Sequence, residues 1–157
     1  MAKPWNIVDL DPSQSLKVCL RRITETRIQE IVSYEHETLK GEDIEALHDM
    51  RVSARRLRAV LQIFRDCFPK KRFKKQDKKL QSLVRYLGAV REQDVFIEML
   101  VSYRARLGAR EGQIIELLIA REQASRVTQR KQLSRELRRL RREDFSASFT
   151  AFLKESL

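Results

Sequence analysis

The sequence predicts an all-α protein, an antiparallel bundle of four to five helices. Only four Gly and three Pro occur in 157 residues, too few for the turns of an all-β sandwich or barrel. Charged residues make up 35% of the chain and hydrophobic residues 42%, a mixture typical of amphipathic helices and not of a disordered basic tail. This length corresponds to one domain, which can bury a core without disulfides or a structural metal.

The N-terminal segment is expected to be irregular up to the first helix-start signal. Pro4 and Pro12 interrupt regular structure, so the prediction is an irregular segment over residues 1–12 and a bundle over residues 13–157. The Asp-Pro-Ser signal combines a proline with a capping hydroxyl and starts the first helix. That helix is expected to end before Gly41.

Turn residues set the limits of the remaining helices. Pro69 is expected to end the second helix, and residues 70–75 to form a basic connector. Gly88 falls inside the third helix, where it indicates a kink or a close helix contact. The predicted helices span residues 13–39, 42–68, 73–107, 111–142 and 144–156.

An apolar stripe marks the core-facing side of the helices. In the second helix the stripe recurs every three or four residues, as in a heptad pattern: Leu47, Met50, Ala54, Leu57, Leu61 and Phe64. The first and third helices carry Leu16, Leu20, Ile23, Ile31 and Tyr34, and Leu80, Leu83, Val84, Leu87, Val90 and Val95. One face of the last helix carries Phe145, Phe149, Phe152 and Leu153.

Basic residues are concentrated in a row beside the apolar stripe of the second helix: His48, Arg51, Arg55 and Arg58. Like charges three or four residues apart destabilise a helix by about 0.2–0.5 kcal/mol per pair, and the row contains no acid. One guanidinium group can donate two parallel hydrogen bonds to a phosphate. The row, in a chain of net charge +11, therefore predicts a strip that binds a polyanion. A solvated charged face is the alternative interpretation.

The third helix carries a second basic row. Lys74, Lys78 and Arg85 share one face, roughly opposite the apolar stripe. Two such rows on adjacent helices would line one groove. Arg91 and Asp94 fall instead on the apolar side, and their spacing predicts an ion pair between them that helps to fix helix packing.

Two sequence blocks resemble the CHAD domain, the conserved histidine α-helical domain. Residues 48–59, HDMRVSARRLRA, meet every fixed position of the approximate family pattern H-D-x-R-V-x-x-R-R-L-R. Residues 80–95 resemble a second family block, L-x-x-L-x-x-x-L-G-x-x-R-D-x-D-V, with Glu92 in place of the usual Asp. The resemblance covers residues 13–107 well and the C-terminal third weakly.

The resemblance implies an all-α fold with a basic surface or pore that binds inorganic polyphosphate, in proteins associated with polyphosphate granules. No catalytic residue, cofactor or metal is expected. Carried over by position, the polyphosphate-binding residues are His48, Arg51, Arg55, Arg56 and Arg58 on the second helix, and Lys78, Arg85 and Arg91 on the third.

The chain has room for only one of the two similar bundles that a typical CHAD domain contains. This departure predicts a homodimer in which two copies rebuild the two-bundle arrangement around a shared channel. A small apolar patch on the second helix, made of Val52, Ala59 and Ile63, is the candidate contact.

Nucleic-acid binding is the second functional hypothesis. Residues 130–142 contain seven basic residues and one acid, and such a run contacts phosphates or stays solvated. Few aromatic residues lie near it to stack on bases, and no recognised DNA- or RNA-binding motif is present. Charge alone does not separate RNA from polyphosphate.

A polyphosphate- or triphosphate-processing enzyme is the third hypothesis. Residues 35–40, EHETLK, miss the E-x-E-x-K motif of the triphosphate-processing domains that are fused to some CHAD domains. The sequence shows neither a nucleophile–His arrangement nor a P-loop, so the prediction is a binding protein and not an enzyme. His48 has a pKa suited to acid–base chemistry, but donation to phosphate or a structural role is favoured for it.

The cellular setting is expected to be the cytoplasm. No apolar run is long enough to span a membrane, and the N-terminal residues lack the apolar region of a signal peptide. Two cysteines are too few for a disulfide framework, which fits a reducing compartment.

Overall fold

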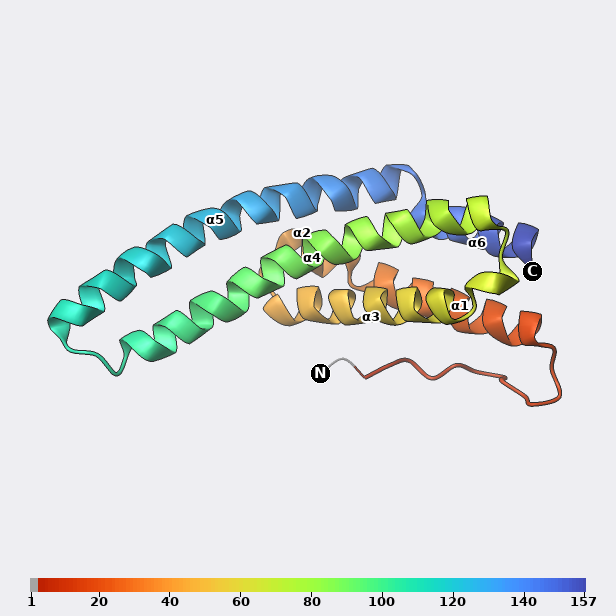
Figure 1. The fold of residues 1–157 in the computed structure, drawn as a ribbon, viewed down its shortest axis with the longest axis horizontal. Helices are drawn as coiled ribbons and strands as arrows, with labels where there is room; N and C mark the ends of the chain where they lie inside the picture. The colour runs from red at the N-terminus through yellow and green to blue at the C-terminus, as the bar shows by residue number, and fades with distance from the viewer. Residues whose placement is uncertain (1–2) are drawn as a thin grey trace.

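The computed structural model describes residues 3–157 and confirms the all-α prediction, with no strand among them (Figure 1). The long helices run antiparallel, with α3 between α1 and α4, and α4 between α3 and α5. The helices are α1 (Leu16–Ser33), α2 (Glu35–Lys40), α3 (Ile44–Ile63), α4 (Lys70–Arg104), α5 (Ala109–Arg142) and α6 (Phe145–Ser156), with a 3-10 turn η1 (Arg65–Cys67).

One hydrophobic core joins these helices. The predicted stripe of α3 is buried at Leu47, Met50, Ala54, Leu57 and Leu61, while Phe64 packs against the core from its edge. The predicted face of α6 is also buried, and its three phenylalanines contact one another. The core therefore forms where the apolar spacing placed it.

The first predicted helix is in fact two helices. The chain turns at Tyr34, whose N–H bonds back to Ile31 and Val32, and α2 leaves in a new direction to pack against α3 and α5. The start also lies later than predicted, because Ser15 and not Ser13 caps α1. Gly41 ends α2 in the left-handed conformation at φ 78°, as its position suggested.

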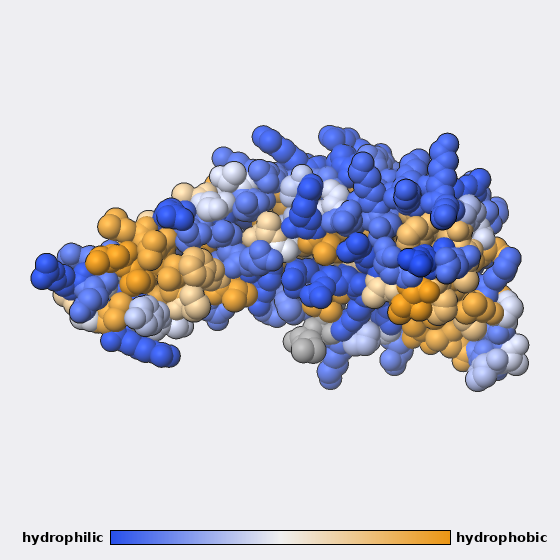
Figure 2. Space-filling view, in the orientation of Figure 1, coloured by the Kyte–Doolittle hydropathy of each residue, from blue (hydrophilic) through white to orange (hydrophobic). Residues whose placement is uncertain are grey.

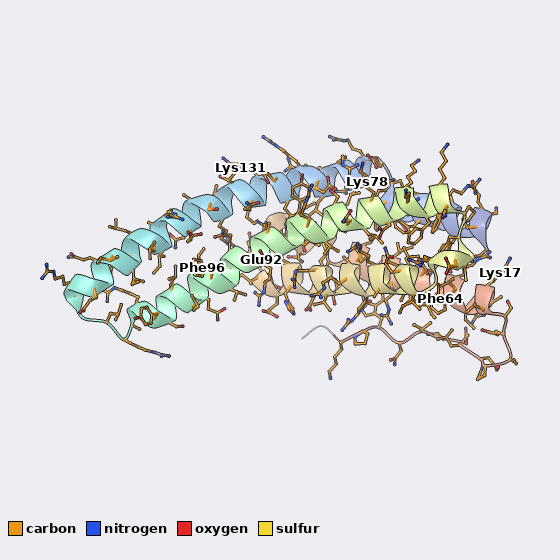
Figure 3. The ribbon with its side chains drawn as sticks, viewed as in Figure 1. Lys17, Phe64, Lys78, Glu92, Phe96 and Lys131 are labelled. Carbon is orange, nitrogen blue, oxygen red and sulfur yellow. The ribbon has the colours of Figure 1, made fainter. Side chains whose placement is uncertain are left out.

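The connection between α3 and α4 lies earlier in the chain than predicted. Helix α3 ends at Ile63, and Phe64 (Figure 3) begins the turn that leads through η1. Pro69 then stands at the start of α4, a position where its missing N–H costs nothing. The expected basic connector over residues 70–75 is therefore the first part of α4.

Helices α4 and α5 form a hairpin that extends beyond the rest of the bundle (Figure 1). Helix α4 has 35 residues and α3 has 20, a difference of about 22 Å at 1.5 Å rise per residue. Val95, predicted as core, is 48% exposed because no helix covers it, and Leu16 at the start of α1 is 52% exposed. Apolar surface gathers at the end of this hairpin (Figure 2).

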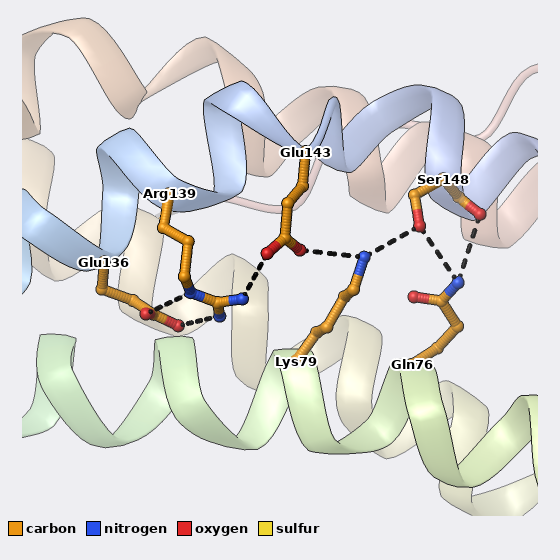
Figure 4. A network of polar contacts seen from close by, with 6 residues as sticks. All are labelled: Gln76, Lys79, Glu136, Arg139, Glu143 and Ser148. Atoms are coloured by element: carbon orange, nitrogen blue, oxygen red, sulfur yellow. Dashed lines mark hydrogen bonds and ion pairs between the residues drawn. The ribbon is translucent and has the colours of Figure 1, made fainter.

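A chain of polar contacts holds α4, α5 and α6 together (Figure 4). Arg139 donates two hydrogen bonds to the Glu136 carboxylate at 3.0 and 2.8 Å and a third to Glu143 at 2.7 Å. Burial alone raises the pKa of Glu136, but hydrogen bonds from Arg139 and Ser82 outweigh it and lower this pKa below its ordinary value. The other contacts are Lys79 to Glu143 and Ser148, and Gln76 to Ser148.

Replacing Arg139 by Met is expected to destabilise the bundle most clearly at neutral pH. A carboxylate with a lowered pKa stabilises the fold above its unfolded pKa and loses that contribution as pH falls through the folded pKa. Without Arg139 the pKa of Glu136 rises, so acid unfolding should begin at higher pH. The loss at neutral pH should be about 1–2 kcal/mol, because the Arg139 side chain is 38% exposed.

Urea unfolding followed by circular dichroism across acidic and neutral pH measures both effects. The control is Arg138→Met, which removes an exposed neighbour that has no ion pair among residues 3–157. Equal acid-unfolding curves for the two variants would contradict the assignment.

Candidate functional site

The basic motif on α3 divides between two helix interfaces. His48, Arg51 and Arg58 lie toward α4, whereas Arg56 lies toward α1. This division follows from helical geometry, because residues three, four or seven apart share a face and Arg56 falls between them. The motif therefore supplies residues both to a surface cleft and to the interior packing.

A cleft of about 440 Å³ opens between α3 and α4. His48 and Arg51 form its α3 wall, and Arg91 enters from α4, so three basic side chains share one hollow. Gly88 of α4 lies beside Arg51: a Cβ built on Gly88 would lie 3.7 Å from Arg51 Nε, an ordinary van der Waals distance, so the close contact does not require a glycine. The remaining lining residues, all on α4, are Glu92, Val95, Phe96 and Met99, of which Glu92 and Phe96 are labelled in Figure 3.

Two nitrogens of the cleft residues are buried without a hydrogen-bond partner among residues 3–157. They are His48 Nδ1 and Arg51 Nε. Leaving such a group unpaired costs about 1–3 kcal/mol, more for a charged one. An oxyanion that reached these groups would offer the oxygen acceptors that the protein does not supply.

Arg58 is neutralised within the protein. Its Nε donates to Asp77 Oδ1 on α4 at 3.1 Å, and Gln62 donates to the same oxygen at 2.9 Å. Sequence reasoning found no acid within the basic row, but Asp77 reaches that row from the neighbouring helix. Arg58 thus has less charge to offer a ligand than Arg51.

Arg56 takes part in a buried ionic cluster between α1 and α3. Glu30 is fully buried. Its carboxylate forms ion pairs with Arg27, at 2.7 Å between Oε2 and Nη1, and with Arg56, at 3.6 Å between Oε1 and Nη1. The N-terminal segment joins the cluster, because the backbone N–H of Trp5 donates to Glu30 and its backbone carbonyl accepts from Arg27. This position gives Arg56 a role in holding α1 against α3.

The other predicted site residues are exposed. Arg55 lies on the outer surface of α3. Lys78 and Arg85 lie on the surface of α4 (Figure 3 labels Lys78), and the Arg85 guanidinium sits 4.8 Å from the centre of the Tyr86 ring. The structure therefore brings together His48, Arg51 and Arg91 in the cleft. Arg55, Lys78 and Arg85 remain accessible charges outside it.

The predicted ion pair between Arg91 and Asp94 is wrong. Asp94 is buried and pairs with Arg126 of α5, because this side of α4 faces α5. Arg91 has no ion pair among residues 3–157 and lines the cleft. This pairing favours a ligand-binding role for Arg91, because Asp94, its expected partner, is paired with Arg126.

A second basic groove, also of about 440 Å³, lies between the end of α2 and α5 and was missed by the sequence analysis. Arg130 anchors it by donating to the Thr38 carbonyl at 2.9 Å, and burial lowers the Arg130 pKa. The spacing of basic residues along one face of 130–142 was visible, but the bend at Tyr34 that brings α2 alongside was not. Its basic lining residues are Lys40, Arg130, Lys131, Arg135 and Arg138.

Arg91 also lines a larger cleft of about 800 Å³ beside α5, where Glu45, Asp94 and Glu98 give the lining a mixed charge. Among 3–157 there is no group of three or more His, Cys, Asp or Glu side chains arranged to hold a metal ion. The second histidine, His36, is exposed and contacts Glu37 at the surface of α2. No helix in the same range is long and apolar enough to cross a bilayer.

The comparison with known families agrees with this architecture. The family description "CHAD domain" matches residues 22–157, which includes the C-terminal third that the two motifs left weakly covered. The chain belongs to the CHAD domain family. No curated protein matches the chain. The His48–Arg58 motif of this CHAD domain thus supplies His48 and Arg51 to the basic cleft, and its Leu80–Val95 block supplies Arg91, Glu92 and Val95.

Proposed function

We propose that this CHAD domain binds inorganic polyphosphate in the cleft between α3 and α4. The observation that carries the proposal is the meeting of His48, Arg51 and Arg91 in one hollow, with two of their nitrogens buried and unpaired. A chain of phosphates carries oxygens along its whole length, so it can serve several such donors at once. The association of CHAD domains with polyphosphate-related proteins supports the same ligand.

The exposed cations extend the binding surface beyond the cleft. Arg55 on α3 and Lys78 and Arg85 on α4 are solvent-exposed, and each would attract a long polyanion that continues past the cleft. Their contribution is mostly electrostatic, because no built pocket surrounds them. We expect the cleft residues to fix the ligand and the exposed residues to strengthen its attraction at low salt.

We propose binding without catalysis. The only carboxylate in the cleft, Glu92, is exposed and comes with no paired carboxylate or nucleophile to act on a phosphate bond. Sustained release of phosphate from long-chain polyphosphate, abolished by His48→Gln, would overturn this part of the proposal. In a cell, such binding would place the protein in the cytoplasm at polyphosphate granules.

RNA is the second candidate ligand, and Phe96 is the observation that favours it. This ring lines the cleft and is 40% exposed, which makes it available for stacking on a base. Polyphosphate has no ring to stack. Phe96→Leu should therefore weaken RNA binding and leave polyphosphate binding almost unchanged.

Competition between size-defined polyphosphate and RNA of matched charge tests the proposal. Fluorescent polyphosphate bound to the protein should be displaced poorly by RNA, and its affinity should fall as salt rises, because phosphate contacts release counterions. Displacement by RNA at equal charge, reduced by Phe96→Leu, would assign the cleft to nucleic acid. Affinity that does not change with salt would contradict a polyanion site altogether.

A further inference from the structure

The protruding α4–α5 hairpin carries an apolar surface that nothing in the chain covers. On α5, Leu117 and Leu118 follow Ile114 by three and four residues, the spacing of a seam that packs against another helix. Monomeric proteins rarely expose contiguous apolar patches of large size, and those that do mark interaction sites. Figure 2 shows this apolar end of the hairpin. Its exposed apolar residues outside the cleft between α3 and α4 are Val101, Tyr103, Ile114, Leu117 and Leu118.

The charge of the hairpin distinguishes it from the rest of the protein. Residues 92–122 hold six acidic and four basic residues, a net charge of −2, so the remainder of the +11 chain carries +13. The net repulsion between two copies is therefore weakest where their hairpins meet.

The distribution of charge along the hairpin is self-complementary. Arg106, Arg110 and Glu111 are exposed at its tip, a net charge of +1, whereas Glu92 and Glu98 are exposed nearer the bundle. None of these five residues has an ion pair among residues 3–157. When two identical hairpins lie antiparallel, the basic tip of each meets the acidic part of the other.

We propose that the hairpin docks against the hairpin of a second copy of this chain. The two hairpins lie antiparallel about a two-fold axis and form a four-helix bundle, which buries the apolar seams of both copies. The contact is isologous, so the contact between the tip of one hairpin and the acidic part of the other occurs twice. This surface differs from the α3 patch of Val52, Ala59 and Ile63 that the sequence offered.

Two matched substitutions distinguish these surfaces. Leu117 on the hairpin and Ile63 on α3 are both 73% exposed, so replacing either by Lys leaves the core intact. Sedimentation velocity at micromolar concentrations should give twice the 18.6 kDa monomer mass for the wild type and for Ile63→Lys, and the monomer mass for Leu117→Lys. A monomeric wild type, or a dimer broken by Ile63→Lys and kept by Leu117→Lys, would overturn the proposal.

A charge exchange tests the antiparallel arrangement. R106E/R110E and E92K/E98K should each be monomeric, because like charges then face each other in either homodimer. An equimolar mixture of the two should form a heterodimer, in which every facing pair is again opposite in sign. Homodimers that persist in both variants, or a mixture that stays monomeric, would rule out the antiparallel contact.

Discussion

Replacing Arg51 by Gln should lower the affinity for polyphosphate by about 10- to 150-fold, the equivalent of one charge-assisted contact of about 1.5–3 kcal/mol. The free energy of unfolding should stay the same or increase. Arg51 Nε is buried without a partner, so removing it also removes an unmet desolvation cost. A residue kept at some cost to stability is typical of a binding site.

Isothermal titration calorimetry with size-defined polyphosphate measures the loss, and urea unfolding measures the stability. Arg58→Gln is the matched control, because it removes the same charge from the same face of α3. Arg58 is already paired with Asp77, so this change should weaken binding less than Arg51→Gln. Equal losses for the two variants would show that only the overall charge matters and that the cleft is not the site.

Replacing Glu30 by Gln should destabilise the fold by about 3–5 kcal/mol, since it leaves buried cations without their counter-charge. Glu30 is fully buried, and the Arg27 side chain beside it is only 10% exposed. The same carboxylate also holds Arg56 and the N–H of Trp5. The loss should therefore loosen α1 and the N-terminal segment together.

Urea unfolding of the Glu30→Gln and Glu25→Gln variants separates the effect of losing a buried, paired carboxylate from the effect of losing one negative charge on α1. Glu25 lies on the same helix, is only half-buried and has no ion pair among residues 3–157, so its replacement should change stability little. Under conditions where Glu30→Gln stays folded, its affinity for polyphosphate should match the wild type. A stability loss of the same size in both variants would contradict the cluster's structural role.

Helical spacing was sufficient to predict the core but not its limits. Leu57 and Phe149 are buried as expected, because an apolar stripe must find a partner wherever helices meet. The same rule failed at Val95, since periodicity shows which face is apolar and not how far the neighbouring helix extends. The bend at Tyr34 was also hidden, because no proline or glycine marks it.

The sequence predicted which site residues share a face of one helix, but not which residues of different helices meet. The row containing His48 and Arg51 followed from spacing within α3, and the cleft lies beside it as expected of a row at a helix interface. Pairing between helices was not visible in the sequence. Asp94 finds its partner in Arg126, 32 residues away, and Asp77 reaches Arg58 from another helix.

The most direct test of polyphosphate binding in the cleft uses the two histidines of the chain as internal probes. His48 lines the cleft, whereas His36 is exposed on α2 with a side chain that is 74% accessible. Nuclear magnetic resonance of the two imidazole rings during titration with size-defined polyphosphate should show His48 shifting to saturation while His36 stays in place. A shift of His36 as large as that of His48, or no shift of His48 at full binding, would contradict the site.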